Sequence, residues 1–252
     1  MDINIEDFFI HSNNVNDITG EDYNNICLLT DTVESFARST YKSIYIIDYF
    51  RKDFLYLSDN LPYLLGITKE EIKKLGYNIY TSYVPKEEQE MLLEINKAGF
   101  DFFDNLPVEE RKKWIINYDF NILNGRHKRL INHTITPIYL TKEGRIWLGL
   151  CTIALSANNK PGNIMMKKIG SNTHNEYSLS THEWNKKQEK ELSQDEKNML
   201  ILSAQGYTMT EISEMMYKSI DSIKYYKRRI FEKFNVKNIT EALAYAINYK
   251  ML

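Results

Sequence analysis

The side chains with the clearest capacity for chemistry are cations near the carboxyl end of the chain. Residues 218–237 carry seven basic residues against two acids, although the formal net charge of the 252-residue chain is −2. Lysine and arginine attract phosphate and can donate hydrogen bonds to base edges in a DNA groove. A basic run is often only a solvated helix face, so its meaning depends on its surroundings. The seven cations are Lys218, Lys224, Lys227, Arg228, Arg229, Lys233 and Lys237.

The spacing of apolar residues predicts that a helix over 220–234 carries most of these cations. At 100° per residue, Ile230 and Phe234 each fall within about 20° of Ile223, and the three residues define a buried stripe. The opposite side holds Asp221, Lys224, Tyr225 and Arg228, and one flank holds Arg229 and Lys233. A helix about 10–12 Å across, anchored on one side and cationic on the other, fits a DNA major groove.

Three further helices are predicted around this one. Ser193 and Glu196 have the spacing of a capping box, and Gly206 ends the helix that they open. Thr208 or Thr210 caps a short second helix, which a turn at residues 217–219 connects to the third. A fourth helix begins at Thr240. Two short helices followed by an anchored cationic helix are typical of helix-turn-helix geometry.

Residues between Leu192 and Ala246 match one family pattern in register. The matching residues are Leu192-Ser193, Glu196, Ala204-Gln205-Gly206, Thr208, Glu211-Ile212, Glu214, Ser219, Ser222-Ile223-Lys224, Lys233-Phe234, Val236-Lys237-Asn238 and Thr240-Glu241-Ala242-Leu243. On these residues the stretch resembles the LuxR-type (GerE-like) DNA-binding domain. Tyr226 stands where the family usually has His, and this difference can change one contact with the DNA backbone. Asn235 departs from the usual Gly, which is benign because Asn tolerates a left-handed helix end.

The resemblance implies which side chains face DNA. Those that match base-facing positions are Lys224, Tyr225 and Arg228. Those that match or flank phosphate positions are Thr208, Ser222, Tyr226, Lys227 and Arg229. Lys224 and Arg228 can donate to guanine N7 and O6, whereas Tyr225 either touches a thymine methyl or only covers the helix. Such proteins typically act as homodimers, and the fourth helix either serves as the dimer surface or packs within the domain through Ala242, Leu243 and Ala246.

The amino-terminal part mixes strand and helix patterns. A helix is predicted over 21–38, followed by two short strands at 43–48 and 54–57, short helices to residue 75 and a longer helix after Pro85. Three strand-like runs then follow at 114–123, 126–140 and 145–155, with Asn124-Gly125 as a strong hairpin signal. This order of elements, over roughly residues 41–155, resembles the PAS fold. A GAF-like or another α+β sheet domain has a similar pattern and stays open.

The predicted fold class is therefore α+β. A PAS-like antiparallel sheet with helices occupies residues 1–155, and a four-helix LuxR-type domain occupies residues 192–252. Residues 156–191 are rich in polar side chains and predict a connector, with an additional strand possible at Tyr177 to Trp184.

Composition and the remaining motifs exclude several other classes. Cys27 and Cys151 are far apart, which excludes a disulfide framework and a cysteine zinc site and fits a reducing, cytoplasmic setting. The first residues lack the pattern of a signal peptide, and the longest apolar runs fall far short of the ~20 residues of a membrane span. His127 and His133 share one side of a strand, but no third ligand lies near, so we expect both at the surface and no metal site.

The resulting hypothesis is a transcriptional regulator that binds double-stranded DNA through its carboxyl-terminal domain under the control of a PAS-like sensor. No catalytic motif is present, so an enzyme is not expected. No residue identifies a cofactor, although the sensor can hold a small molecule. A receiver domain is disfavoured because consecutive strands contradict alternating βαβ units. The alternative is a ligand-binding or partner-docking signalling module with weak or no DNA affinity.

Overall fold

The computed structural model describes residues 3–24, 26–40, 43–249 and 251–252. Tyr41 and Lys42, where the predicted sensor core begins, lie outside the described residues. The chain divides into two compact units. The first unit, the sheet domain, comprises Met1–Leu155 and Lys160–Lys187, and the second, the helical domain, comprises Ser156–Asn159 and Gln188–Leu252. The α+β class predicted from the sequence is confirmed.

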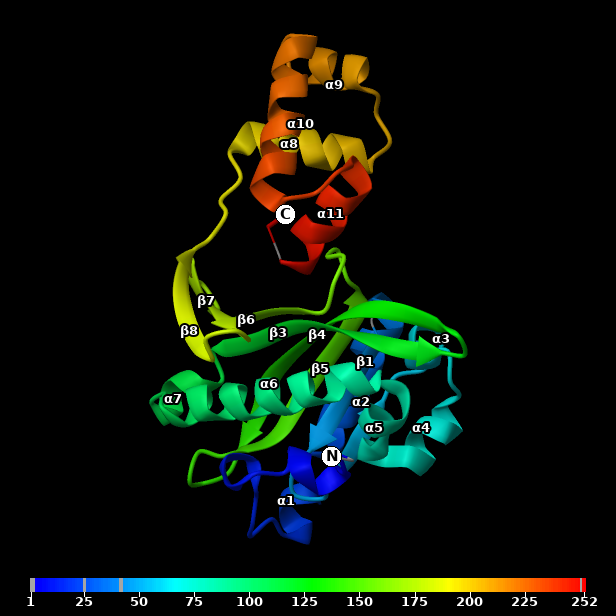
Figure 1. The fold of residues 1–252 in the computed structure, drawn as a ribbon, viewed down its shortest axis with the longest axis vertical. Helices are drawn as coiled ribbons and strands as arrows, with labels where there is room; N and C mark the ends of the chain where they lie inside the picture. The colour runs from blue at the N-terminus through cyan, green and yellow to red at the C-terminus, as the bar shows by residue number, and fades with distance from the viewer. Residues whose placement is uncertain (1–2, 25, 41–42, 250) are drawn as a thin grey trace. The chain divides into compact units, whose positions relative to one another are not determined.

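The sheet domain is built on one eight-stranded sheet (Figure 1). Its strand order is β2-β1-β5-β4-β3-β6-β7-β8, and the pairings from β2 through β7 are antiparallel. The strands are β1 Ser43–Asp48, β2 Asp53–Leu57, β3 Trp114–Asn124, β4 His127–Leu140, β5 Ile146–Leu155, β6 Gly162–Lys168, β7 Thr173–Ser178 and β8 Glu183–Gln188. The predicted hairpin at Asn124-Gly125 joins β3 to β4, with Asn124 opposite His127 and Gly125 at a φ of 59°.

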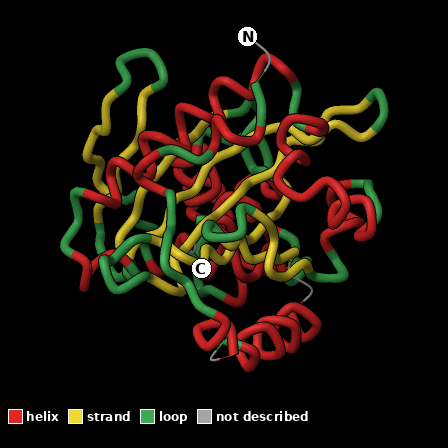
Figure 2. Tube along the Cα trace, turned by 90° about the horizontal axis from the view of Figure 1, so that it is seen from below, coloured by secondary structure: helices red, strands yellow, loops and turns green. Residues whose placement is uncertain are grey.

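Helices of the sheet domain gather around the strands (Figure 2). The helices are α1 Gly20–Asn24, α2 Cys27–Thr40, α3 Leu61–Leu65, α4 Lys69–Leu75, α5 Ile79–Tyr83, α6 Lys86–Asp104 and α7 Val108–Arg111, and three short 3-10 turns lie at Ile5–Phe8, His11–Asn13 and Gly76–Asn78. Pro85 precedes α6, which buries Leu92, Ile95 and Phe103. The predicted order of two strands, short helices, a longer helix and a three-strand meander is thus present.

The polar connector predicted at 156–191 is wrong for most of its length, because β6, β7 and β8 lie there. β6 pairs with β3 and places Met166 opposite Ile116, where it is fully buried. β8 is exposed along nearly its whole length, which explains why its sequence is polar. The single strand predicted at Tyr177 to Trp184 is instead the end of β7, a turn with His182 at a φ of 57°, and the start of β8.

His133 is not at the surface, contrary to the prediction, whereas His127 is exposed. Side chains alternate along β4, so His133 shares the core face with the fully buried Ile131. Its Nε2 lies 2.5 Å from the Tyr45 hydroxyl oxygen. His127 is the first residue of β4, where the burial pattern is still exposed. Burial without a charged partner lowers the pKa of the His133 imidazole to about 3.

This burial predicts an acid-sensitive sheet domain. An unfolded histidine takes up a proton near pH 6.5, whereas folded His133 stays neutral until about pH 3. The unfolded state therefore binds more protons between these values, and the free energy of unfolding falls as pH decreases, by about 2 kcal/mol between pH 6.5 and pH 5. Urea unfolding at several pH values tests this. His133→Asn removes most of that slope, and an unchanged slope in this variant would place the titration elsewhere.

The helical domain contains α8 Gln194–Ala204, α9 Met209–Met215, α10 Ile220–Phe234 and α11 Ile239–Asn248. Capping boxes at Ser193 and Thr208 open the first two helices, so Thr208 rather than Thr210 is the second cap. The third helix has its predicted bounds and ends at Asn235, in the left-handed region with φ 57°. α11 begins earlier than the predicted Thr240, because the Asn238 side chain accepts a hydrogen bond from the Glu241 N–H.

One apolar cluster holds these four helices together. Its fully buried members come from every helix: Leu200, Ile212, Ile223, Ile230, Ala242 and Ala246, with Ile212 at 1% exposure and the others at 0%. Ala242 and Ala246 therefore pack within the domain, and Leu243 packs, partly buried, against the same cluster. In the described part of the chain, no helix combines the length and the apolar character needed to cross a membrane.

Candidate nucleic-acid interface

Helix α10 has two chemically opposite sides. Ile223 and Ile230 are completely buried and Phe234 is nearly so, whereas Lys224, Tyr225 and Arg228 are exposed. All three predicted base-facing residues thus share one accessible side of a helix that is fixed from behind. The side chains of Lys224 and Arg228 are 62% and 70% exposed, so both cations are available to an incoming ligand.

The contacts of these two cations within the protein are weak. The Lys224 Nζ lies 3.4 Å from Asp221 Oδ1, and the Arg228 Nε lies 3.9 Å from Glu232 Oε1. Ion pairs between exposed side chains on one helix contribute only about 0.3–0.5 kcal/mol. The Tyr225 ring lies beneath Arg228 and Arg229, whose guanidinium carbons are 5.9 and 5.7 Å from its centroid. A phosphate or a base edge can therefore replace the existing partners at little cost.

A groove along α10 extends this surface and includes residues that the sequence analysis missed. Its lining combines polar and apolar side chains: Lys224, Lys227, Arg228, Glu232 and Asn235, with Met209, Phe231 and Val236. The Lys227 ammonium lies 5.5 Å from the centroid of the Phe231 ring. Phe231 lies between Lys227 and Arg228 on the helical wheel, a signal that could have been read from the sequence. Met209 could not, because it belongs to the preceding helix.

The flank of α10 that faces α8 is held by two adjacent acids. The Tyr226 hydroxyl donates to Asp195 Oδ2 over 2.8 Å. The Arg229 Nε lies 3.5 Å from Glu196 Oε1, and the Lys233 Nζ lies 2.9 Å from Glu196 Oε2. Tyr226 and Arg229, both predicted to meet phosphates, thus have partners inside the domain. Of the predicted phosphate-facing side chains on α10, Lys227 is the one that lines the open groove.

Glu196 is fully buried yet surrounded by groups that favour its charged form. Burial by itself raises the pKa of a carboxyl group, but here Lys233, the Ser193 N–H and Arg229 together hold the pKa of Glu196 below its ordinary value. The N–H of Ser193 donates to Glu196 Oε2 over 2.7 Å. The carboxylate therefore joins the start of α8 to the second half of α10.

Thr208 and Ser222 lie at the amino ends of α9 and α10. The Thr208 hydroxyl donates to Glu211 Oε2 over 2.8 Å, and the Ser222 N–H donates to the Ser219 hydroxyl over 3.1 Å. Thr208 is exposed and Ser222 is half-buried. The amino end of a helix favours negative charge, so the start of the 15-residue α10 suits a phosphate near Ser222.

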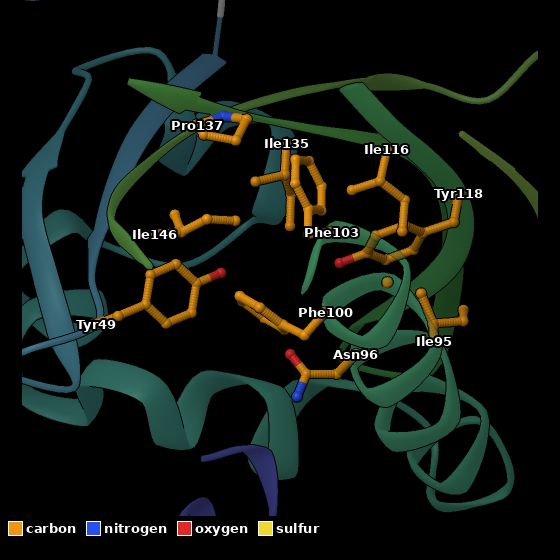
Figure 3. A pocket seen from close by; sticks show the side chains of 11 residues that line it. Tyr49, Ile95, Asn96, Phe100, Phe103, Ile116, Tyr118, Ile135, Pro137 and Ile146 are labelled. Atoms are coloured by element: carbon orange, nitrogen blue, oxygen red, sulfur yellow. The ribbon is translucent and has the colours of Figure 1, made fainter. Parts of the chain in front are cut away.

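The sheet domain contains a small cavity of about 40 Å³ between α6 and the sheet (Figure 3). Tyr49 and Phe100 meet edge to face there, with ring centroids 5.2 Å apart. The side chains with polar atoms are Tyr49, Asn96 and Tyr118, and burial raises the pKa of both tyrosines, which keeps them neutral. None of the described residues that line the cavity is an acid, a cation, a histidine or a cysteine. Among the described residues, no three His, Cys, Asp or Glu side chains are placed to hold a metal ion.

Comparison with known proteins finds a family match for the helical domain. Residues 190–246 match the family model for bacterial regulatory proteins of the luxR family (GerE). The oxygen regulatory protein NreC of Staphylococcus carnosus (strain TM300) is 36% identical over 61 residues, which are 24% of this chain and 28% of NreC. The chain therefore spans little more than a quarter of that relative.

Two solved structures are similar over most of the chain at low identity. The phage VqmA–DPO complex is 17% identical, covers 89% of this chain and 92% of its own, and has a TM-score of 0.33. The Vibrio cholerae VqmA dimer without target DNA is 13% identical, covers 88% of each chain and has a TM-score of 0.35. The family resemblance predicted from the motifs is confirmed for the helical domain alone: residues 190–246 match the luxR family of bacterial regulatory proteins.

Proposed function

We propose that this chain is a cytoplasmic transcriptional regulator that recognises double-stranded DNA by placing α10 in the major groove. The exposed cationic side of α10, opposite its buried stripe, carries this proposal. Lys224, Tyr225 and Arg228 face the base edges. The phosphate contacts come from Lys227, Thr208 and Ser222, while Tyr226 and Arg229 first have to release their acids if they are to take part.

We propose further that the chain acts as a homodimer. A single α10, called the reading helix below, makes too few base contacts to specify a genomic site, and a two-fold pair doubles them. The sheet domain is proposed to be a PAS-like sensor, which the order of its elements supports. The cavity beside α6 is then the site of the sensed molecule. Its neutral, mostly apolar lining favours a small uncharged ligand, and anything larger than a few atoms has to displace a side chain such as Phe100.

A selection experiment tests the DNA-binding function. The full chain is incubated with random-sequence duplexes, and the bound fraction is amplified and sequenced. We expect enrichment of one motif, with an affinity that falls at least about tenfold between 50 and 200 mM salt, as one phosphate contact by Lys227 from each protomer of a dimer predicts. Failure to enrich any duplex, with affinity that is weak at 50 mM salt, would favour a partner-docking module instead.

A further inference from the structure

The contact between Asp195 and Tyr226 joins α10 to α8 at one of the two residues where this chain departs from the LuxR pattern. The Tyr226 hydroxyl donates to Asp195 Oδ2 over 2.8 Å, and Lys218, in the turn before α10, places its Nζ 3.3 Å from the same oxygen. The pKa shifts of the three groups reflect these contacts. Tyr226 and Lys218 hold the pKa of Asp195 below its ordinary value, and Asp195 raises the pKa values of Tyr226 and Lys218.

Asp195 and Glu196 hold α10 at two different levels. Asp195 contacts Tyr226 and Glu196 contacts Lys233, seven residues further along the helix. At 1.5 Å per residue these contacts are about 10 Å apart along the axis. Both come from the first turn of α8 and both act on the same flank of α10. Two such points fix the rotation of the helix as well as its height, which a single point cannot do.

The two acids differ in burial and hence in what they contribute. Glu196 is fully buried, so its removal takes away the carboxylate that Arg229 and Lys233 share, although Lys233 still donates to the Glu191 carbonyl oxygen. The side chain of Asp195 is 37% exposed, and that of Lys218 is 40% exposed. Ion pairs at this level of exposure add little to folding stability. The main consequence of the Asp195 contact is therefore geometric: together with the packing of the Tyr226 ring against the apolar cluster, it fixes the position of the ring and of the exposed side of α10.

We propose that Asp195 is a positioning residue for DNA reading that acts through Tyr226, and that the Tyr226 hydroxyl serves this contact rather than a DNA phosphate. The proposal rests on the DNA-binding function proposed above. A misplaced reading helix loses its hydrogen bonds to base edges but keeps its attraction to phosphates. Loss of the contact should therefore lower affinity for the recognised sequence and leave non-specific binding unchanged.

The test uses the full chain, the duplex enriched by the wild type and a scrambled duplex of equal length. Tyr226→Phe removes only the hydroxyl, and we expect about five- to tenfold weaker binding to the enriched duplex. Binding to the scrambled duplex and the slope of affinity against salt should not change. Asp195→Ala should lower the ratio of the two affinities by a similar factor, and the double variant should lower it no further. Asp195→Asn keeps an oxygen that can accept from Tyr226 and should restore most of the ratio.

Two controls separate the effect from charge and from loss of a hydroxyl. Glu214→Ala removes one negative charge from an exposed position of α9, and Tyr83→Phe breaks a matched tyrosine–carboxylate contact, to Glu71, in the sheet domain. Neither should change the ratio. Equally weaker binding of Tyr226→Phe to both duplexes would overturn the proposal and make Tyr226 a phosphate contact. Additive effects of the two single changes would also overturn it. A wild type that enriches no duplex refutes the DNA-binding function itself, before any variant is measured.

Discussion

Replacing Lys224 and Arg228 together by alanine is expected to lower affinity for the enriched duplex at least about 100-fold, since each good contact to a base pair contributes about 1–3 kcal/mol. Both side chains lie on the exposed side of α10, and their partners Asp221 and Glu232 are exposed residues of the same helix. Their removal should therefore leave the fold unchanged, so that the loss reports contacts with DNA. Fluorescence anisotropy with a labelled duplex measures it.

A control for net charge is available in the sheet domain. Lys73 and Lys74 are consecutive exposed lysines of α4, and their double alanine variant loses the same two positive charges. We expect this variant to bind the enriched duplex almost as well as the wild type. The affinity of the Lys224→Ala/Arg228→Ala double variant for the enriched duplex is compared with that of the wild type at low salt. If the two affinities differed by less than threefold while the helical domain was still folded, α10 would not be the helix that reads the duplex.

Ile230→Ala is expected to destabilise the helical domain by about 2–5 kcal/mol. Ile230 is completely buried in the centre of the stripe that fixes α10, so the change leaves a cavity among the helices. A domain of this size has little stability to spare, and a loss of this magnitude unfolds much of it at 37 °C. DNA binding should fail together with the unfolding transition of this domain, while the transition of the sheet domain stays in place.

Calorimetry on the full chain follows both transitions at once. Ile247→Ala provides the matched control. Ile247 is 56% exposed on α11, so its truncation leaves no internal cavity. We expect this control to melt like the wild type. If Ile230→Ala and Ile247→Ala proved equally stable, the stripe would not be what holds the reading helix in place.

Local signals explain why the helical domain was predicted closely. Ser219 and Asn235 mark both ends of α10, and the stripe of Ile223, Ile230 and Phe234 fixes which side is buried. The acids that hold its flank were not predicted, because Asp195 is 31 residues from Tyr226 and no periodicity links them. Tyr226 was therefore assigned to a phosphate by resemblance alone, before its partner was visible.

The sheet domain shows where pattern reasoning fails. β6, β7 and β8 extend the sheet beyond β3, and their polar exposed sides resemble a connector when only composition is considered. Ile164 and Met166 alternate with more exposed residues and are buried, but a run this short is ambiguous without its pairing partner. His133 was misplaced for a related reason. A histidine on a strand has no intrinsic preference for either face, and only its alternation with Ile131 assigns it to the core.

The most direct test of the account is methylation interference on the enriched duplex. Methylation at guanine N7 blocks the major-groove acceptor to which Lys224 and Arg228 are proposed to donate. The account predicts that duplexes methylated at specific guanines are excluded from the fraction bound by the wild type, and that Arg228→Ala abolishes this exclusion for at least one guanine in each half-site. Uniform tolerance of N7 methylation across the enriched sequence would contradict the placement of α10 in the major groove.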